Sequence, residues 1–321
     1  MSEPRVAYLT LIYGDPGVGK SVNTIMCAPN SLFIGEYSAI MAPAKSVCGI
    51  DIDPANIIVP DDLDQATQII SEIGAGKRKL ANGQPVESVV IDDLSLLALR
   101  QFDKLQVDPT MQGRGAPDHF KVQNAFTSKI LKQRDTARRA NVTVLVSGHM
   151  GTQHVNQLTG QTIKGGVKLR GQIQADIGQA YDQVLLCVRD ASRWPIGHPV
   201  SFCVDADDSF VTKDRLNVVA GYMPFNLGEI FRFRGLTFSR FAGMSWMDEA
   251  VDKYSQAING ALNDAQLMDR NTVLGITSQL RKDIEAKYTK IVAHQNWCIQ
   301  DAYHRVLIAR LVSKRSNSLW G

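Results

Sequence analysis

Residues 13–21, YGDPGVGKS, combine residue types at a spacing that phosphate binding uses. Gly14, Gly19, Lys20 and Ser21 fit the pattern G-x-x-x-x-G-K-[ST]. Glycines let backbone N–H groups turn inward around phosphate oxygens, while the lysine contacts the β and γ phosphates and the serine hydroxyl ligates Mg²⁺. The segment therefore predicts a site for a nucleoside triphosphate such as ATP, bound with Mg²⁺.

Residues 14–21 are hereafter called the glycine loop. The residues on either side of it match a strand–loop–helix unit. Residues 6–13 are apolar and β-prone, and a helix-compatible run follows Ser21. That context favours a nucleotide site, because the helix N-terminus adds a dipole that attracts anions. The alternative is a glycine-rich turn that binds nothing. The expected nucleotide-binding residues here are Gly14, Asp15, Pro16, Gly17, Val18, Gly19, Lys20, Ser21 and Val22.

Two carboxylates, Asp92 and Asp93, come at the end of another apolar run, the predicted strand 87–92. An aspartate at the end of a strand beside a phosphate-binding loop can hold Mg²⁺ through water, and we expect Asp92 to do so with Ser21. A capping or solvated Asp92 is the alternative. Asp93 precedes Leu-Leu-Ala-Leu in a helix-compatible run and could instead be a helix N-cap.

Hydrolysis also needs a group that orients or deprotonates water. Glu36 follows the apolar run 31–35, and the carboxyl ends of parallel strands face the ligand crevice. Glu36 is therefore the candidate for positioning water, against an ordinary surface glutamate. His149 follows another buried run and could sense the γ-phosphate as a tenth nucleotide-binding residue, or could be a histidine satisfied within a loop.

Composition places few limits on the partner. The 321 residues include 44% hydrophobic and 21% charged residues, with a formal net charge of +3, which is too small to demand nucleic acid or an anionic membrane. An odd number of scattered cysteines favours reduced thiols. No apolar run approaches the length of a membrane span and the N-terminal residues resemble no signal peptide, so we expect a cytoplasmic protein. The cysteines are Cys27, Cys48, Cys187, Cys203 and Cys298.

The elements that must position these residues alternate along the chain, which predicts an α/β fold with a mostly parallel central sheet flanked by helices. Two polar, glycine-rich segments, 101–119 and 149–166, are expected to be loops, and long loops in a compact domain are usually functional. After residue 246 the chain is helix-compatible. The expected strands are 6–13, 31–36, 57–59, 87–92, 142–148, 183–189 and 200–204, and the clearest helices are 63–73 and 120–139.

Seven segments follow one another along the chain: the glycine loop, LFIGEY (32–37), GIDIDPANIIVPDD (49–62), VVIDDLSLLA (89–98), NVTVLVSGH (141–149), KGGVKLRGQ (164–172) and VTKDR (211–215). In this order, they resemble the RecA-type recombinase core, and most closely the compact phage-encoded RecA-like ATPases, some of which anneal single strands. The resemblance covers about residues 5–235 and implies a P-loop NTPase of RecA-like type, with a core at 1–240 and a helical C-terminal extension at 241–321.

The resemblance also implies roles for residues outside the glycine loop. Lys20 and Glu36 would be catalytic, and Lys213 and Arg215 would reach the γ-phosphate of a neighbouring subunit in a ring or filament. Lys168 and Arg170 are weaker candidates for that role. The alternative for all four cations is surface pairing with nearby aspartates.

By the same resemblance, residues 101–119 and 149–166 would face single-stranded DNA. They carry phosphate-binding side chains but are only mildly basic, and their aromatic residues, Phe102 and Phe120, lie at the edges. Three functions follow: an ATP-dependent recombination or annealing factor, an ATPase that acts on protein during virus assembly or remodelling, with 241–321 as its adaptor, or a structural virion subunit braced by nucleotide. The expected DNA contacts are Arg114, His119, His154 and Lys164.

Overall fold

The computed structural model describes most of the chain, and every structural statement below refers to that part. The described residues are 7–28, 30–48, 50–155, 160, 162–170, 173–189, 201–204, 209–215, 217, 219, 221–224, 226–232, 245–287 and 302–314.

The central feature is a twisted sheet, in which the described strands follow the order β12-β10-β9-β1-β5-β4-β2-β3. The six strands from β9 to β3 are parallel, while β10, β12 and β11 run antiparallel at the other side and β8 pairs with the end of β5. The strands are β1 (Leu9–Gly14), β2 (Ser31–Gly35), β3 (Ile57–Ile58), β4 (Ser88–Asp92), β5 (Thr143–Gly151), β6 (His154–Val155), β7 (Thr162–Ile163), β8 (Gly166–Val167), β9 (Gln183–Arg189), β10 (Ser201–Val204), β11 (Lys213–Asp214) and β12 (Tyr222–Pro224).

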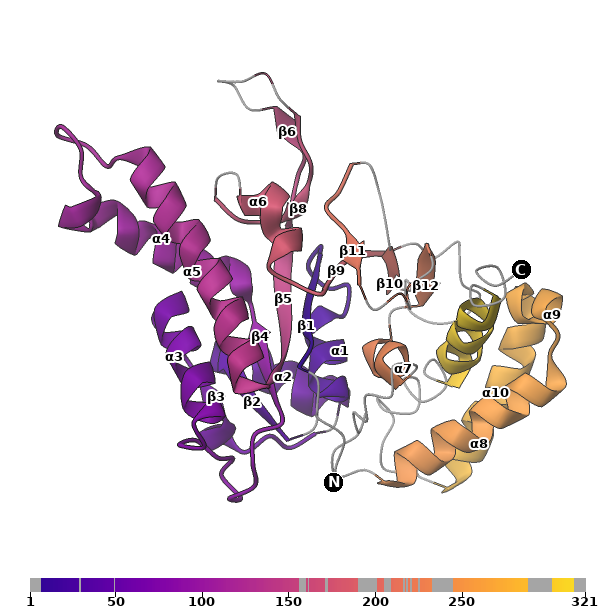
Figure 1. The fold of residues 1–321 in the computed structure, drawn as a ribbon. Helices are drawn as coiled ribbons and strands as arrows, with labels where there is room; N and C mark the ends of the chain where they lie inside the picture. Colours follow the sequence, from indigo (N-terminus) through magenta and orange to yellow (C-terminus); the bar gives the residue numbers. More distant parts are fainter. Residues whose placement is uncertain are drawn as a thin grey trace.

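Helices cover both faces of this sheet (Figure 1). The helices α3, α4 and α5 lie on one face, and α1, α7 and the C-terminal helices lie toward the other. The helices are α1 (Lys20–Cys27), α2 (Tyr37–Pro43), α3 (Leu63–Gly74), α4 (Leu94–Val107), α5 (His119–Ala140), α6 (Ile173–Asp176), α7 (Leu227–Arg232), α8 (Ser245–Ala261), α9 (Asp264–Met268), α10 (Arg270–Lys287) and a last helix at 302–314, with short turns at Pro54–Asn56, Pro109–Met111 and Ile177–Gln179.

Each face of the sheet has its own apolar core because side chains alternate along each strand. In β1, Ile12 packs on the α1 side, whereas Leu11 and Tyr13 pack on the α3–α5 side. In β4, Val90 and Ile91 divide in the same way. The α/β class and the mostly parallel sheet predicted from the sequence are confirmed, and every predicted strand is present.

Two predictions about loops were partly wrong. The segment 101–119 was expected to be a loop, but α4 continues through Val107 because Leu94, Leu97, Phe102 and Leu105 bury one helical face. The segment 149–166 contains the end of β5, the paired strands β6 and β7, and the start of β8. Residues 156–159 and 161 of that segment lie outside the described residues.

Helix α2 was not predicted, and a π-helical turn at Ala44–Cys48 follows it directly. Pro43 lies at the end of α2. Because proline has no N–H to donate, the regular hydrogen-bond ladder is interrupted there, which fits the change of helix type. The turn buries Ala44 and Cys48 against α1, and burial raises the pKa of the Cys48 thiol to about 12.

The C-terminal helices pack on the same apolar core as α1 and α7. Val251, Tyr254 and Ile258 of α8 belong to that core, together with Ile25 of α1 and Phe231 of α7. Polar contacts add to this packing. Arg305 of the last helix lies 3.7 Å from Glu229 of α7 and also pairs with Asp252 of α8, and the Tyr303 hydroxyl donates to the Leu267 carbonyl at 2.9 Å. Residues 315–321 lie outside the described residues.

Candidate functional site

The glycine loop connects the end of β1 to the start of α1, as the strand–loop–helix pattern predicts. Gly17 and Gly19 have φ angles of 77° and 90°, a left-handed conformation that glycine adopts without steric cost. The N-terminus of α1 has no side-chain cap. Its first N–H groups are therefore available to an anion, and the helix dipole favours negative charge at that position.

Lys20 lies inside this loop and is only 8% exposed. Its ammonium donates hydrogen bonds to the carbonyl oxygens of Gly14, at 2.9 Å, and Asp15, at 2.8 Å. An ammonium carries three N–H donors, so these two bonds leave one donor for a phosphate oxygen. The geometry fits the phosphate-binding role expected for Lys20.

The charges around Lys20 are mostly negative. Burial lowers the pKa of Lys20 below its usual value, and the acidic groups of Cys187, Asp92, Asp93 and Asp15 act in the opposite direction. Three aspartates therefore lie within electrostatic range of one buried lysine. A bound triphosphate would meet this negative charge unless a metal ion or another cation balanced it.

Asp92 ends β4 at the same edge of the sheet as the glycine loop, with β5 between β4 and β1. Its carboxylate is largely buried and accepts a hydrogen bond from the Ser147 hydroxyl of β5. Among the described residues, no group of three or more His, Cys, Asp or Glu side chains could hold a metal ion. Mg²⁺ commonly takes only one or two protein oxygens and completes its shell with water and phosphate oxygens. The Ser21 hydroxyl and the Asp92 carboxylate are donors of that kind.

Asp93 is the N-cap of α4, which was the reading offered for it from the sequence. Its carboxylate accepts from the Leu96 N–H at 2.6 Å and lies 2.8 Å from His149 Nε2. The backbone N–H of His149 also donates to the Ser95 hydroxyl oxygen at 3.1 Å. Because His149 is directly opposite Gly14 in the pairing of β5 with β1, its backbone lies beside the start of the glycine loop.

Glu36 follows β2 at the same edge, but its side chain turns to α4. Its carboxylate bonds to Arg100 Nη2 at 2.7 Å, and Arg100 Nη1 bonds to the Pro60 carbonyl at 3.2 Å. The strands β4 and β5 lie between β2 and β1, a backbone separation of roughly 14 Å. The structure therefore places Glu36 at the carboxyl ends of the strands but pairs it with Arg100. To act on a water molecule at the glycine loop, Glu36 would have to leave that pair.

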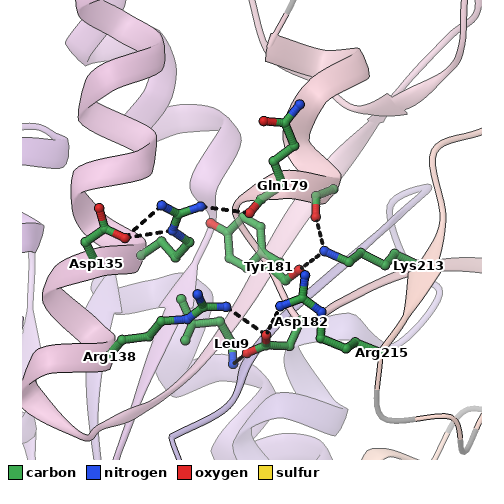
Figure 2. Close-up of polar contacts among 10 residues, drawn as sticks. Leu9, Asp135, Arg138, Gln179, Tyr181, Asp182, Lys213 and Arg215 are labelled. Atoms are coloured by element: carbon green, nitrogen blue, oxygen red, sulfur yellow. Dashed lines mark hydrogen bonds and ion pairs between the residues drawn. The ribbon is translucent and has the colours of Figure 1, made fainter.

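Lys213 and Arg215 lie at the other end of the parallel strands, where β11 pairs with the first residues of β9. Figure 2 shows the two cations beside Tyr181 and Asp182. The Asp182 carboxylate accepts from Arg215 at 3.3 Å, from Arg138 at 2.9 Å and from the Leu9 N–H, the first residue of β1, at 3.2 Å. Gly14 is five residue steps along the extended strand from Leu9, about 16 Å. Arg215 therefore lies far from the glycine loop of its own chain.

Lys213 has an intramolecular role. Its ammonium donates to the carbonyl oxygens of Gly178 and Tyr181, the latter at 2.8 Å, and Arg134 donates to the Gln179 carbonyl at 3.0 Å. These cations occupy the C-terminal end of the short helical segment 173–179, where positive charge is favourable. Burial lowers the pKa of Lys213, and the positive charge of Arg215 lowers it further.

A pocket of about 460 Å³ lies beside His149. Its walls come from the first turns of α4, from His149 and from residues 168–170, which are held against β5 by a hydrogen bond of 2.7 Å from the Lys168 N–H to the His149 carbonyl. Leucine side chains line part of the pocket, and Lys168 and Arg170 add positive charge. The pocket thus offers apolar surface and cations next to the candidate nucleotide site.

The expected DNA-facing segments differ in their aromatic residues. Phe102 is buried edge-to-face against Phe126, so it cannot stack on a base. Phe120 is 82% exposed at the start of α5, next to the exposed Lys121. Arg114 is exposed between α4 and α5, and Figure 1 shows that connection lying well away from the sheet. His154 is exposed in the β6–β7 hairpin and Lys164 follows β7.

Three contacts at this site were missed by the sequence analysis. Ser147 binds Asp92, Arg100 binds Glu36, and Arg189 at the end of β9 donates to the Gly17 carbonyl. Ser147 could have been noticed as the polar residue of an apolar run. The other two depend on which strands and helices are neighbours, and no local pattern carries that information.

No protein-family model matches the chain, and no curated protein matches its sequence.

None of the described helices combines the length and the apolar character that crossing a membrane requires.

Proposed function

We propose that the protein is a P-loop ATPase of RecA-like type that binds single-stranded DNA and acts in recombination or strand annealing. The observation that carries the nucleotide part is the placement of Lys20, Ser21 and Asp92 at one edge of a parallel sheet, beside a loop with two left-handed glycines. Lys20 would hold the β and γ phosphates, while Ser21 and Asp92 would hold Mg²⁺, which would neutralise charge on the transferring phosphate.

The hydrolytic step requires Glu36 to orient or deprotonate the attacking water. His149 would contact the γ-phosphate from the end of β5, next to Gly14. In the proposal, Lys213 and Arg215 act on the nucleotide of a neighbouring subunit, because their own glycine loop lies at the other end of the strands. That role implies a homo-oligomer, either a ring or a filament. We expect it to work in the cytoplasm, that of the host if the chain is phage-encoded.

The DNA part is supported by the exposed side chains between α4 and α5 and in the β6–β7 hairpin. Phe120 offers a stacking surface beside Lys121, and Arg114 and His154 are exposed donors for phosphate oxygens. The mild charge of the chain leaves an ATPase that acts on protein as the second candidate, favoured by the apolar Val107, which is 77% exposed at the end of α4.

Steady-state ATP hydrolysis, with and without single-stranded DNA, tests the proposal. We expect single-stranded DNA to stimulate turnover, and Lys20→Ala to abolish it. Rising salt should weaken the stimulation, because counterions compete for the phosphates of the DNA. Turnover that ignores DNA would move the function to a protein substrate. Bound nucleotide without turnover would mean that nucleotide is only a structural brace and that Glu36 is not catalytic.

A further inference from the structure

We infer that Arg189 is a second phosphate-binding cation of the nucleotide site, supplied by the same chain as the glycine loop. The inference rests on the proposed function, since it names a further residue of that site. It begins from the hydrogen bond that Arg189 Nη2 donates to the carbonyl oxygen of Gly17, in the middle of the glycine loop.

The sheet explains why this arginine reaches the loop. Strand β9 is the parallel neighbour of β1 on the side opposite β5, and Cys187 lies opposite Gly14. Arg189 is two residues beyond Cys187, so both side chains leave the same face of β9. Cys187 packs in the core on the α1 side of the sheet. The guanidinium therefore extends over the face on which α1 begins and where a phosphate chain would lie.

The approach of this guanidinium to the loop is close. A β-carbon added at Gly17 would lie 3.4 Å from Arg189 Nη2, so the group covers the loop as well as bonding to it. A guanidinium carries five N–H donors in a planar fork. One bond to a carbonyl leaves donors for phosphate oxygens, which such a fork binds in pairs.

The net negative charge around Lys20 favours a second cation at this site. Asp15, Asp92 and Asp93 act on one lysine, a sum of one positive and three negative charges, or −2. Arg189 raises that sum to −1 before any metal ion is bound. A triphosphate with Mg²⁺ still carries negative charge, so a cation at the open side of the loop favours its binding.

Isothermal titration with MgATP and MgADP tests the inference, using the wild-type protein, Arg189→Gln and Arg189→Lys. Arg189→Gln removes the charge, and we expect it to weaken MgATP binding by about tenfold or more, as the loss of a charge-assisted hydrogen bond does. Arg189→Lys keeps the charge without the fork and should lose less. The matched control is Arg78→Gln, because Arg78, which lies just beyond α3, also forms a close polar contact, with Glu72 of α3. It should bind MgATP like the wild type.

Thermal unfolding of the nucleotide-free variants distinguishes a phosphate contact from a clip, meaning a hydrogen bond to Gly17 that only stabilises the conformation of the loop. A phosphate contact predicts an unchanged midpoint for Arg189→Gln and a larger loss for MgATP than for MgADP. Equal losses for both nucleotides together with a lower midpoint would overturn the inference in favour of a clip. Wild-type affinity in Arg189→Gln would also overturn it and leave the proposed function intact. Failure of the wild-type protein to bind either nucleotide would instead overturn the proposed function itself.

Discussion

Gly14 meets two separate steric demands. It begins the glycine loop, and it also packs against β9, where an added β-carbon would overlap the carbonyl oxygen of Cys187. The clash is with backbone, which cannot rotate away as a side chain can. The absence of a β-carbon at this position is therefore needed for the sheet itself as well as for the candidate nucleotide site.

We accordingly expect Gly14→Ala to lower the free energy of unfolding by about 1–3 kcal/mol, the usual cost of overpacking a tight interior. Urea denaturation measures it. Gly275→Ala is the matched control, because Gly275 lies within α10 with open space around its Cα, and alanine there should stabilise the helix by up to about 1 kcal/mol. Equal midpoints for Gly14→Ala and the wild type would show that β1 and β9 can separate at no cost.

Residue types alone located much of the candidate nucleotide site, but not the partners of its carboxylates. Lys20, Ser21 and Asp92 could be named from spacing, because a local strand–loop–helix pattern and a strand end fix their positions. The pairs Glu36–Arg100 and Asp93–His149 join residues 64 and 56 positions apart, figures that follow from their numbers in the sequence. Such pairs depend on the order of strands in the sheet, which hydrophobic pattern does not encode.

At the scale of single elements, α3 shows how one side chain can hold both the start of a helix and its contact with the next helix. Asp62 is its N-cap and accepts from the Gln65 N–H at 3.0 Å, and the same carboxylate bonds to Lys104 of α4 at 2.5 Å. One side chain thus starts α3 and links it to the neighbouring helix. Burial acts to raise the pKa of Asp62, but the hydrogen bonds from Lys104 and Gln65 outweigh it and lower the pKa below its usual value.

We expect Asp62→Ala to lower the free energy of unfolding by about 1 kcal/mol at neutral pH, because the cap is lost. Asp62→Asn keeps a good cap and should lose less, since Lys104 is well exposed and such ion pairs contribute little. A carboxyl with a lowered folded pKa stabilises the fold above its unfolded pKa, near 3.9, and loses that effect as pH falls through the folded value.

The difference between the wild type and Asp62→Ala should therefore be complete at pH 7 and shrink below about pH 4. Chemical denaturation across that range measures it. A difference that grew on acidification would contradict the assignment of Asp62 as a carboxylate held by its partners.

Element boundaries explain the two loop predictions that were partly wrong. The glycines at 113 and 115 correctly mark a turn, but the apolar spacing from Leu94 to Leu105 carries α4 well into the segment expected to be loop. At 149–166, the strands β6 and β7 are two residues each, too short for an alternating pattern to be recognised. Secondary structure that depends on pairing with a distant strand leaves a weak local signal.

At the scale of the whole molecule, the candidate nucleotide site and Arg215 lie at opposite ends of the parallel strands. Because of this separation, Arg215 can act at a glycine loop only if that loop belongs to a second copy of the chain. Arg215, which is 58% exposed, is the better placed of the two cations for this, because Lys213 is occupied by two carbonyl oxygens.

Mixing two inactive variants tests this arrangement. Arg215→Ala subunits keep an intact glycine loop and Glu36, and Glu36→Gln subunits keep Arg215, so we expect each to be inactive alone and the mixture to recover ATP hydrolysis. The matched control mixes Lys20→Ala with Glu36→Gln subunits, in which every site carries a damaged glycine loop or glutamate, and it should stay inactive. A mixture no more active than its components, or a protein that sediments as a monomer with ATP, would contradict the role of Arg215.

The shared core of α1, α7 and the C-terminal helices has a practical consequence for producing the protein. A shortened version that stopped before α8 would keep the glycine loop but uncover the apolar side chains that pack against Val251, Tyr254 and Ile258. Exposed apolar surface of that kind promotes aggregation during expression. Anyone seeking a smaller piece for crystallisation would do better to keep the chain through residue 314, and to shorten the β6–β7 hairpin instead, since neither of its two-residue strands belongs to either core.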